Sequence, residues 1–391
     1  MSTIRPDALV AAPALVRASG GASSRLWDNA ALAVFALVAL AVALTFRDYG
    51  LGWDDYTHSQ MGDLLLALYG SGFKDQRAFS FVNLYMYGGG FDMAAALAAK
   101  LLPFDLFETR RLMGGLVGLV GLAITWRLAR RVAGPRAGFF AAVLLAACPL
   151  YYGHMFINAK DTPFAVAVVL LVYALVRLYE AYPRPGAALF GLFALALGAS
   201  IGTRIMGGVA VLYIVLPQLV VMKADLDRAG AAVALGNAAR FALGVVLALP
   251  FAYAVMGALW PWSVLSPLNP LHAIVYFDHF FETPWRELFN GTLILVPDMP
   301  WTYLPTLFAL KLPELFSVAT LLGAGLVVRS TWQGEGTPQA RAGLLVVLCA
   351  AFVPILLAIV TRPALYNGLR HFLFVVPPMA VLGGLGADWL L

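Results

Sequence analysis

The chain has 391 residues, of which 61% are hydrophobic and 12% are Asp, Glu, Lys or Arg, about half the charged share of an ordinary soluble domain. A soluble core cannot bury that much apolar surface, and 13% aromatic residues do not suit a disordered chain. The apolar stretches are continuous, so an all-α, polytopic membrane protein is predicted. The net charge of +5 follows from basic loops, and no nucleic-acid partner is expected.

About ten transmembrane helices are predicted, because roughly 20 apolar residues cross the hydrocarbon of a bilayer. The stretches 137–153 and 187–202 are short and rich in Ala, Gly and Leu, which is typical of helices packed against other helices. The expected spans are 29–46, 112–126, 137–153, 163–179, 187–202, 205–222, 241–259, 312–328, 342–360 and 372–387.

Residues 1–26 are predicted to be a cytoplasmic tail, with the first span as an uncleaved signal anchor. The loops after the second, fourth, sixth and eighth spans are then also cytoplasmic, and each is basic, as the positive-inside rule requires. An even number of spans returns the C-terminus to the cytoplasm. Residues 27–391 are expected to form one domain in the inner or plasma membrane.

Two outer loops, 47–111 and 260–311, are far longer than connectors need to be. Their segments 61–69, 79–102 and 276–288 are amphipathic or aromatic and are expected to lie flat on the membrane surface. Most histidines also fall on this side. Because the ionisable groups gather at the outer face, the functional site is expected at that face.

Two adjacent acidic residues, Asp54 and Asp55, follow the first span as it enters the outer loop. Neighbouring carboxylates cannot both point the same way, so one can face a substrate while the other binds a helix end or a cation. A carboxylate at the edge of a low-dielectric site can act as a general base for a hydroxyl. An Asp-Asp N-cap of a helix beginning near Thr57 explains the pair equally well.

Two later spans carry charged residues at their outer ends. Pro163 suits the first turn of a helix, and capping is the favoured local explanation for Asp161. Lys160 beside it places an ion pair at the mouth of the bundle. Arg204 lies between two spans joined too tightly for a loop. Its position favours snorkelling to the headgroups, and phosphate binding by the planar guanidinium is the alternative.

The last span opens with Arg370 and His371, which either anchor the interface or supply a second cation to the same phosphate. Trp301 and Tyr303 belong to an aromatic group that is expected to form the interfacial belt, from which one or two rings can stack on a sugar. The sequence NGT at 290–292 matches a glycosylation acceptor, but this pattern is frequent by chance and carries no weight.

In their order and shared sidedness these segments resemble the membrane glycosyltransferases of the GT-C superfamily. The nearest group looks like glycosyltransferase family 39, the protein-mannosyltransferase and aminoarabinose-transferase type. Its acidic pair is often Asp-Glu, so Asp55 is a mild departure. Many relatives continue past the last span, so two interpretations remain: the chain is a compact member of the family, or it is a shortened one. The matching segments are Asp54-Asp55, Asp161-Thr162-Pro163, Thr203-Arg204, the Pro-Trp-x-Tyr-x-x-Pro segment at 300–305, and Arg370-His371 before Pro377-Pro378.

The resemblance implies a polyprenyl-phosphate sugar donor and inverting transfer to a hydroxyl of a lipid, glycan or protein on the periplasmic or extracellular face. Asp54 is then the expected base, with Asp55 as orienter or substitute. The expected phosphate cations are Arg204, Arg370 and Lys160. The expected contacts to the substrates are Asp161, His58, His371, Trp301 and Tyr303.

No cofactor is required, because arginines can neutralise a monophosphate leaving group. A divalent metal held by Asp54, Asp55 and either His272 or His279 is the alternative. A secondary transporter and a membrane oligosaccharide ligase or polymerase are the rival functions. A transporter needs ionisable residues near the middle of its spans, and the sequence places its charged residues at the span ends.

Overall fold

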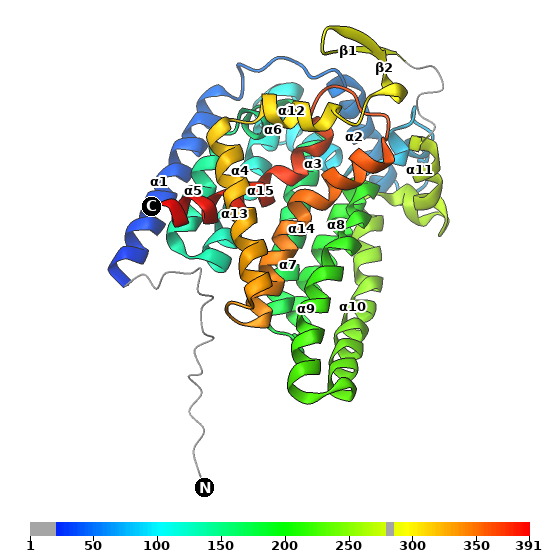
Figure 1. Cartoon of the computed structure of the whole chain (residues 1–391). Helices are drawn as coiled ribbons and strands as arrows, with labels where there is room; N and C mark the ends of the chain where they lie inside the picture. The colour runs from blue at the N-terminus through cyan, green and yellow to red at the C-terminus, as the bar shows by residue number, and fades with distance from the viewer. Residues whose placement is uncertain (1–20, 279–284) are drawn as a thin grey trace.

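The computed structural model describes residues 21–278 and 285–391. In this part of the chain the helices form one bundle, with several short helices and a small β-hairpin gathered at one end (Figure 1). The first 20 residues of the predicted tail lie outside the described ranges, so the cytoplasmic placement of the tail stays a prediction.

Within the described residues, eight helices are long and apolar enough to cross a membrane. A bent pair of shorter helices and an apolar helix of 17 residues complete the pattern of ten predicted spans. The long helices are α1 (Gly21–Thr45), α4 (Leu106–Ala133), α7 (Asp161–Glu180), η3 with α9 (Ile205–Val211, Leu212–Ala229), α10 (Ala231–Leu259), α13 (Glu314–Gln333), α14 (Pro338–Thr361) and η6 with α15 (Arg370–Val375, Val376–Leu390). The bent pair is α5 (Pro135–Ala146) and α6 (Pro149–Ile157), and the 17-residue helix is α8 (Ala187–Thr203).

The predicted span over 137–153 is bent, because α5 and α6 meet at an angle of 59°. Cys148 has extended backbone angles (φ −81°, ψ 110°), and Pro149 then begins the next helix. A proline has no N–H to donate to the preceding turn, and it disfavours helical angles in the residue before it. The break turns α6 toward the end of the bundle that carries Asp54, which we call the site end.

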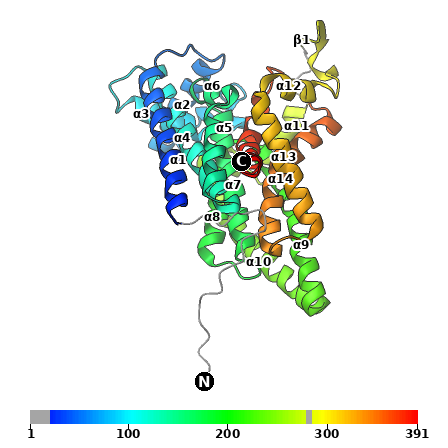
Figure 2. The same ribbon diagram turned by 60° about the vertical axis from the view of Figure 1, so that its left-hand side comes forward.

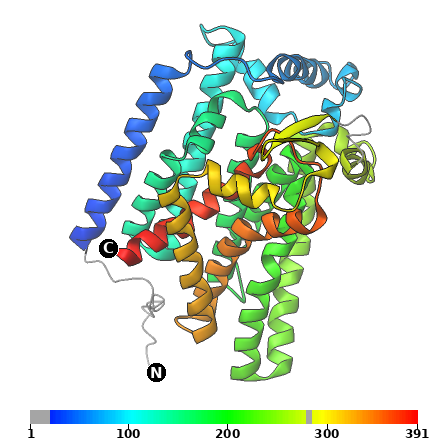
Figure 3. The ribbon, with the colours of Figure 1, turned by 45° about the horizontal axis from the view of Figure 1, so that its top comes forward.

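The two long outer loops fold into short elements at the site end. The first loop contains α2 (Asp55–Gly70), η1 (Arg77–Phe79), η2 (Leu84–Met86) and α3 (Gly90–Ala99). The second contains η4 (Pro261–Val264), α11 (Asn269–Asp278), β1 (Arg286–Phe289), β2 (Thr292–Leu295), η5 (Val296–Asp298) and α12 (Tyr303–Lys311). Figure 3 shows α12 and the hairpin extending over this end of the bundle.

The hairpin is a departure from the all-α expectation. Strands β1 and β2 are antiparallel and are joined by Asn290 and Gly291, which both have positive φ angles, 48° and 77°. Asn-Gly is the favoured pair for such a two-residue turn, since both residues tolerate this conformation. The predicted surface segment 276–288 is therefore no single helix: its described parts belong to α11 and to β1.

Both ends of the described chain meet at the end of the bundle opposite the site. Arg130 at the end of α4 makes a bidentate ion pair with Asp28 in α1. Arg136 at the start of α5 binds Asp388 in α15. A cavity of about 190 Å³ lies between these elements. The described chain thus makes an even number of passes, whereas the cellular side of each end stays a prediction.

Helix α15 is the most buried span and packs between α5 and α13 (Figure 2). Glycines let the backbones approach closely, as small residues do in membrane bundles. A Cβ at Gly323 in α13 would collide with the backbone oxygen of Leu382, and one at Gly386 would collide with that of Ala319. This contact fixes α15, and η6 with Arg370 and His371 directly precedes α15 at the site end.

We expect Gly323→Ala to lower the free energy of unfolding by about 1–3 kcal/mol, because the new methyl group meets backbone that cannot move aside. The measurement is thermal unfolding of the purified protein in detergent. Gly325→Ala in the same helix is the matched control, since a Cβ at Gly325 would enter open space. Equal loss in both variants would contradict the close approach of α13 and α15.

Candidate functional site

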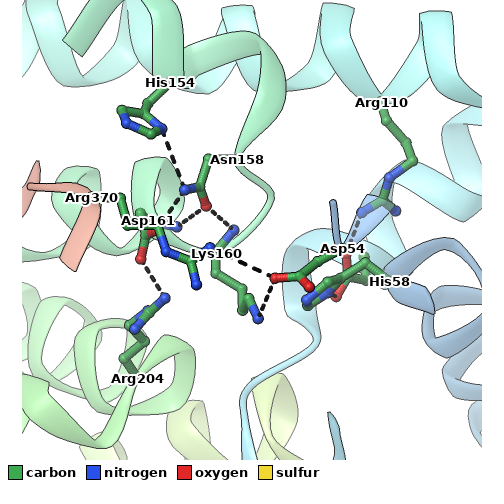
Figure 4. A network of polar contacts seen from close by, with 10 residues as sticks. Asp54, His58, Arg110, His154, Asn158, Lys160, Asp161, Arg204 and Arg370 are labelled. Atoms are coloured by element: carbon green, nitrogen blue, oxygen red, sulfur yellow. Dashed lines mark hydrogen bonds and ion pairs between the residues drawn. The ribbon is translucent and has the colours of Figure 1, made fainter. Parts of the chain in front are cut away.

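Three segments distant in the sequence converge at Asp54 (Figure 4). Its Oδ2 atom lies 3.3 Å from Nζ of Lys160 and 3.7 Å from a guanidinium nitrogen of Arg370. Asp54 occupies the N-cap position of α2, but within the described residues its side chain makes no capping hydrogen bond. The carboxylate is 39% exposed, so it is both ion-paired and open to a substrate.

The two adjacent acids have opposite environments. The backbone N–H of Gly52 donates to Asp55 at 2.7 Å, which turns this carboxyl group toward its own loop. Burial raises the pKa of Asp55. Burial also raises that of Asp54, but the charges of Lys160, His58 and Arg370 outweigh it and leave the pKa of Asp54 below its usual value. Asp54 is therefore the more acidic member of the pair.

A second ion pair, between Asp161 and Arg204, lies beside the first. Asp161 is 2% exposed. The amide oxygen of Asn158 accepts the backbone N–H groups of Lys160 (3.2 Å) and Asp161 (2.9 Å), while its amide nitrogen donates to the Asp161 carboxylate. Asn158 thus supports the start of α7, while the Asp161 carboxylate pairs with Arg204. Capping therefore does not explain Asp161, and snorkelling to the headgroups does not explain Arg204.

Tyr87 joins the two ion pairs. Its ring centroid lies 4.8 Å from Nζ of Lys160 and 6.0 Å from Cζ of Arg204, and burial raises the pKa of its hydroxyl. The next residue, Gly88, lies against the end of α8, where a Cβ would collide with the backbone of Gly202. Sequence reasoning missed Tyr87, although an aromatic residue before three glycines marks a close backbone approach.

A largely apolar groove of about 340 Å³ begins at this charged cluster. Arg204, His371 and Tyr87 form its polar end. The apolar lining comes from α7, η3, α11, α14, the segment before η6, and η6 itself. It consists mainly of Phe164, Ile205, Met206, Ile274, Phe277, Pro354, Leu357, Ala358, Pro363, Leu365, Phe372 and Phe374.

The hairpin braces the segment that carries Arg370. Glu287 in β1 accepts the backbone N–H of Asn367 at 2.7 Å and the hydroxyl of Tyr303 at 3.3 Å, and burial raises the pKa of Tyr303 to about 12. Tyr303 therefore holds the hairpin. Trp301 is 55% exposed, and in the described chain neither of these two aromatic residues lines the groove.

The two histidines predicted to contact the substrates lie in different places. His371 lines the groove. His58 is buried, and its Nδ1 atom lies 2.6 Å from Asp92, so it does not line the groove. In the ranges that the structure describes, no cluster of three His, Cys, Asp or Glu side chains can hold a metal. His272 belongs to no such cluster, and His279 lies outside the described residues.

Comparison with known proteins bears on the fold of the chain. Residues 91–253, less than half of the chain, match the family described as dolichyl-phosphate-mannose-protein mannosyltransferase. No curated protein matches the sequence significantly.

Solved structures of similar fold include two of ArnT from Cupriavidus metallidurans, each 18% identical. The apo form has a TM-score of 0.58 and covers 91% of this chain and 59% of its own. The form bound to undecaprenyl phosphate has a TM-score of 0.53, with 95% and 61% covered. The archaeal oligosaccharyltransferase AglB from Archaeoglobus fulgidus, in complex with an inhibitory peptide and a dolichol-phosphate, is 13% identical with a TM-score of 0.56, and 92% and 50% are covered.

The chain therefore has the GT-C fold, and its resemblance to these membrane glycosyltransferases is confirmed. It spans about three fifths of the length of the ArnT chains and half of the AglB chain.

We expect Asp161→Asn to lower the free energy of unfolding by about 3–5 kcal/mol, because it leaves the Arg204 guanidinium without its partner in a buried site. Asp227→Asn is the control: it breaks the exposed pair with Lys223 and is expected to cost less than about 1 kcal/mol. Thermal unfolding in detergent measures both. Similar small losses would show that the Asp161 pair is as well solvated as the control pair.

Proposed function

We propose that the protein is an inverting membrane glycosyltransferase that moves a sugar from a polyprenyl-phosphate donor to a hydroxyl acceptor on the periplasmic or extracellular face. The observation that carries this proposal is Asp54, which is 39% exposed and paired with Lys160 and Arg370, beside the Asp161–Arg204 pair whose arginine lines an apolar groove. The acceptor hydroxyl needs the Asp54 carboxylate as a base, and the donor phosphate needs cations beside it. The apolar polyprenyl tail suits the groove.

The charges at the end of the groove match such a donor. Lys160, Arg204 and Arg370 face two carboxylates, Asp54 and Asp161, so one positive charge remains. A sugar phosphodiester of a polyprenol carries one negative charge. Guanidinium groups present a planar fork of donors to phosphate oxygens, and a lipid-phosphate ligand is supported by the similar fold of ArnT bound to undecaprenyl phosphate.

The proposed reaction is a single displacement. Asp54 accepts the proton of the acceptor hydroxyl while the hydroxyl oxygen bonds to the anomeric carbon. The bond from that carbon to the phosphate oxygen breaks, and the phosphate leaves with the electron pair. Fixed cations already in place stabilise the charge that develops on the leaving group. One displacement from the opposite side inverts the anomeric centre.

A panel of radiolabelled polyprenyl-phosphate monosaccharides, incubated with the purified protein and candidate acceptors, tests the proposal. With at least one of these donor sugars, the label should move from the lipid to an acceptor. Uptake of a free solute into vesicles without any lipid-linked sugar would instead favour a secondary transporter. Transfer confined to oligosaccharide donors would favour a ligase or polymerase.

Asp54→Asn is expected to reduce sugar transfer at least about 100-fold, the contribution of a general base, while expression and lipid-phosphate binding persist. The measurement is initial rate at saturating donor and acceptor. Asp63→Asn, on an exposed position of the same helix, is the control with wild-type rate. Retained activity in Asp54→Asn would remove Asp54 as the base.

Arg204→Ala and Arg370→Ala are expected to raise the KM for the donor about tenfold or more, the loss of one charge-assisted contact. The KM for the acceptor should change much less, because the phosphate belongs to the donor. Arg329→Ala, exposed near the opposite end of the bundle, is the control. Equal changes for both substrates would contradict phosphate binding by these arginines.

A further inference from the structure

The turn that carries Asp54 also carries Trp53, which is 99% exposed. Tyr56, three residues later in the first turn of α2, is 66% exposed. The proposed transfer assigns no role to either residue. Two large aromatic side chains left open beside a reacting carboxylate require an explanation, because exposing their apolar surface to water is unfavourable.

Hydrogen bonds and close packing make this turn rigid. The backbone N–H of Asp55 donates to the carbonyl oxygen of Gly52 at 3.1 Å, and the N–H of Gly52 donates to the Asp55 carboxylate at 2.7 Å. Asp54 has φ −93° and ψ −5°, the angles of the third residue of a type I turn, so Trp53 is the second residue. A Cβ at Gly52 would lie 2.6 Å from the backbone oxygen of Ile157, so the turn rests against the end of α6. Trp53 and Asp54 therefore project from one fixed turn.

The exposed face of α2 that follows this turn is polar. Residues three or four apart share a helix face, and here Tyr56 is followed by Gln60 and Asp63, all three exposed. The opposite face, which includes Leu65, is buried among apolar residues of the chain itself. An amide and a carboxylate suit water and not lipid tails, so a ligand of the aromatic rings approaches from the water.

The chemistry of the two rings points to a sugar as this ligand. A sugar ring carries C–H groups on its faces and hydroxyl groups around its edge. The C–H face packs on the electron-rich face of an indole or phenol ring, and this contact turns the edge hydroxyls toward the neighbouring groups. Here the neighbour of Trp53 is Asp54, the proposed base. Neither aromatic ring bears a charge, so a neutral acceptor fits this place.

We propose that Trp53 and Tyr56 form the acceptor subsite and that the acceptor is a neutral glycan, whose sugar ring stacks on Trp53 and brings a hydroxyl to Asp54. This inference rests on the proposed function and names the class of its acceptor. The donor phosphate occupies Lys160 and Arg370 at the groove, while the acceptor approaches Asp54 from the water. Because the turn is already rigid, little conformational entropy is lost when the acceptor binds.

Trp53→Ala is expected to raise the KM for the glycan acceptor about tenfold or more, the usual loss when a central aromatic contact is truncated, and to leave the KM for the donor unchanged. Trp53→Phe keeps an aromatic face and should keep most of the acceptor affinity. Trp332→Ala, at a residue 91% exposed in the last turn of α13 near the opposite end of the bundle, is the matched control with wild-type kinetics. An unchanged KM for the acceptor, or equal changes for both substrates, would overturn the subsite.

A binding measurement without turnover separates this inference from the proposed function. Protein labelled with fluorotryptophan is held in phosphatidylcholine nanodiscs and followed by fluorine NMR, and the Trp53 signal is assigned from Trp53→Phe. Neutral trisaccharides of glucose, mannose, galactose and N-acetylglucosamine are added in turn. At least one of them should shift the Trp53 signal and leave the Trp332 signal unchanged.

Two outcomes of this measurement would overturn the inference even if sugar transfer is found. In the first, no trisaccharide shifts the Trp53 signal. In the second, a spin-labelled lipid broadens this signal more than a water-soluble gadolinium chelate does, which would make Trp53 a membrane anchor. A trisaccharide that binds at Trp53 in a protein that transfers no sugar would instead overturn the proposed function alone.

Discussion

The proposed reaction depends on one competition, in which a carboxylate and the donor phosphate require the same cations. Asp54 is held by Lys160 and Arg370 in the structure as it stands, and a lipid phosphate at the end of the groove would draw on both. In a region of low dielectric such an exchange of partners changes the charge state of every neighbour. In the proposed reaction, donor binding and the ionisation of Asp54 are thus coupled through Lys160 and Arg370.

The residues around Asp54 confine this competition to Lys160 and Arg370. Asp161 neutralises Arg204 and is supported by Asn158, and the ring of Tyr87 lies against both Lys160 and Arg204. The buried Asp161 carboxylate would be costly alone, but it has a cation and a hydrogen bond from Asn158. The net excess is a single positive charge, so the cluster suits a monoanionic phosphodiester better than a neutral sugar or a highly charged nucleotide.

The rest of the fold supplies rigid supports for these few atoms. Close glycine contacts fix α15 against α13 and α3 against α2, and the hairpin holds the segment before Arg370 through Glu287. Each support reaches the site from a different part of the chain. A change in one of them can therefore alter the electrostatics of the site without removing a charged group.

The sequence determined the membrane class, the approximate spans and the outer acidic and basic segments, because hydrophobicity and the ends of apolar runs are local properties. Their order also sufficed for the family resemblance. Only the tertiary structure decided that Asp161 pairs with Arg204, that Asp55 faces its own loop, and that His58 binds Asp92. Local rules favoured capping and snorkelling, since they see only neighbours along the chain. Ion pairs between residues far apart in the chain depend on how helices pack, and no local pattern records that.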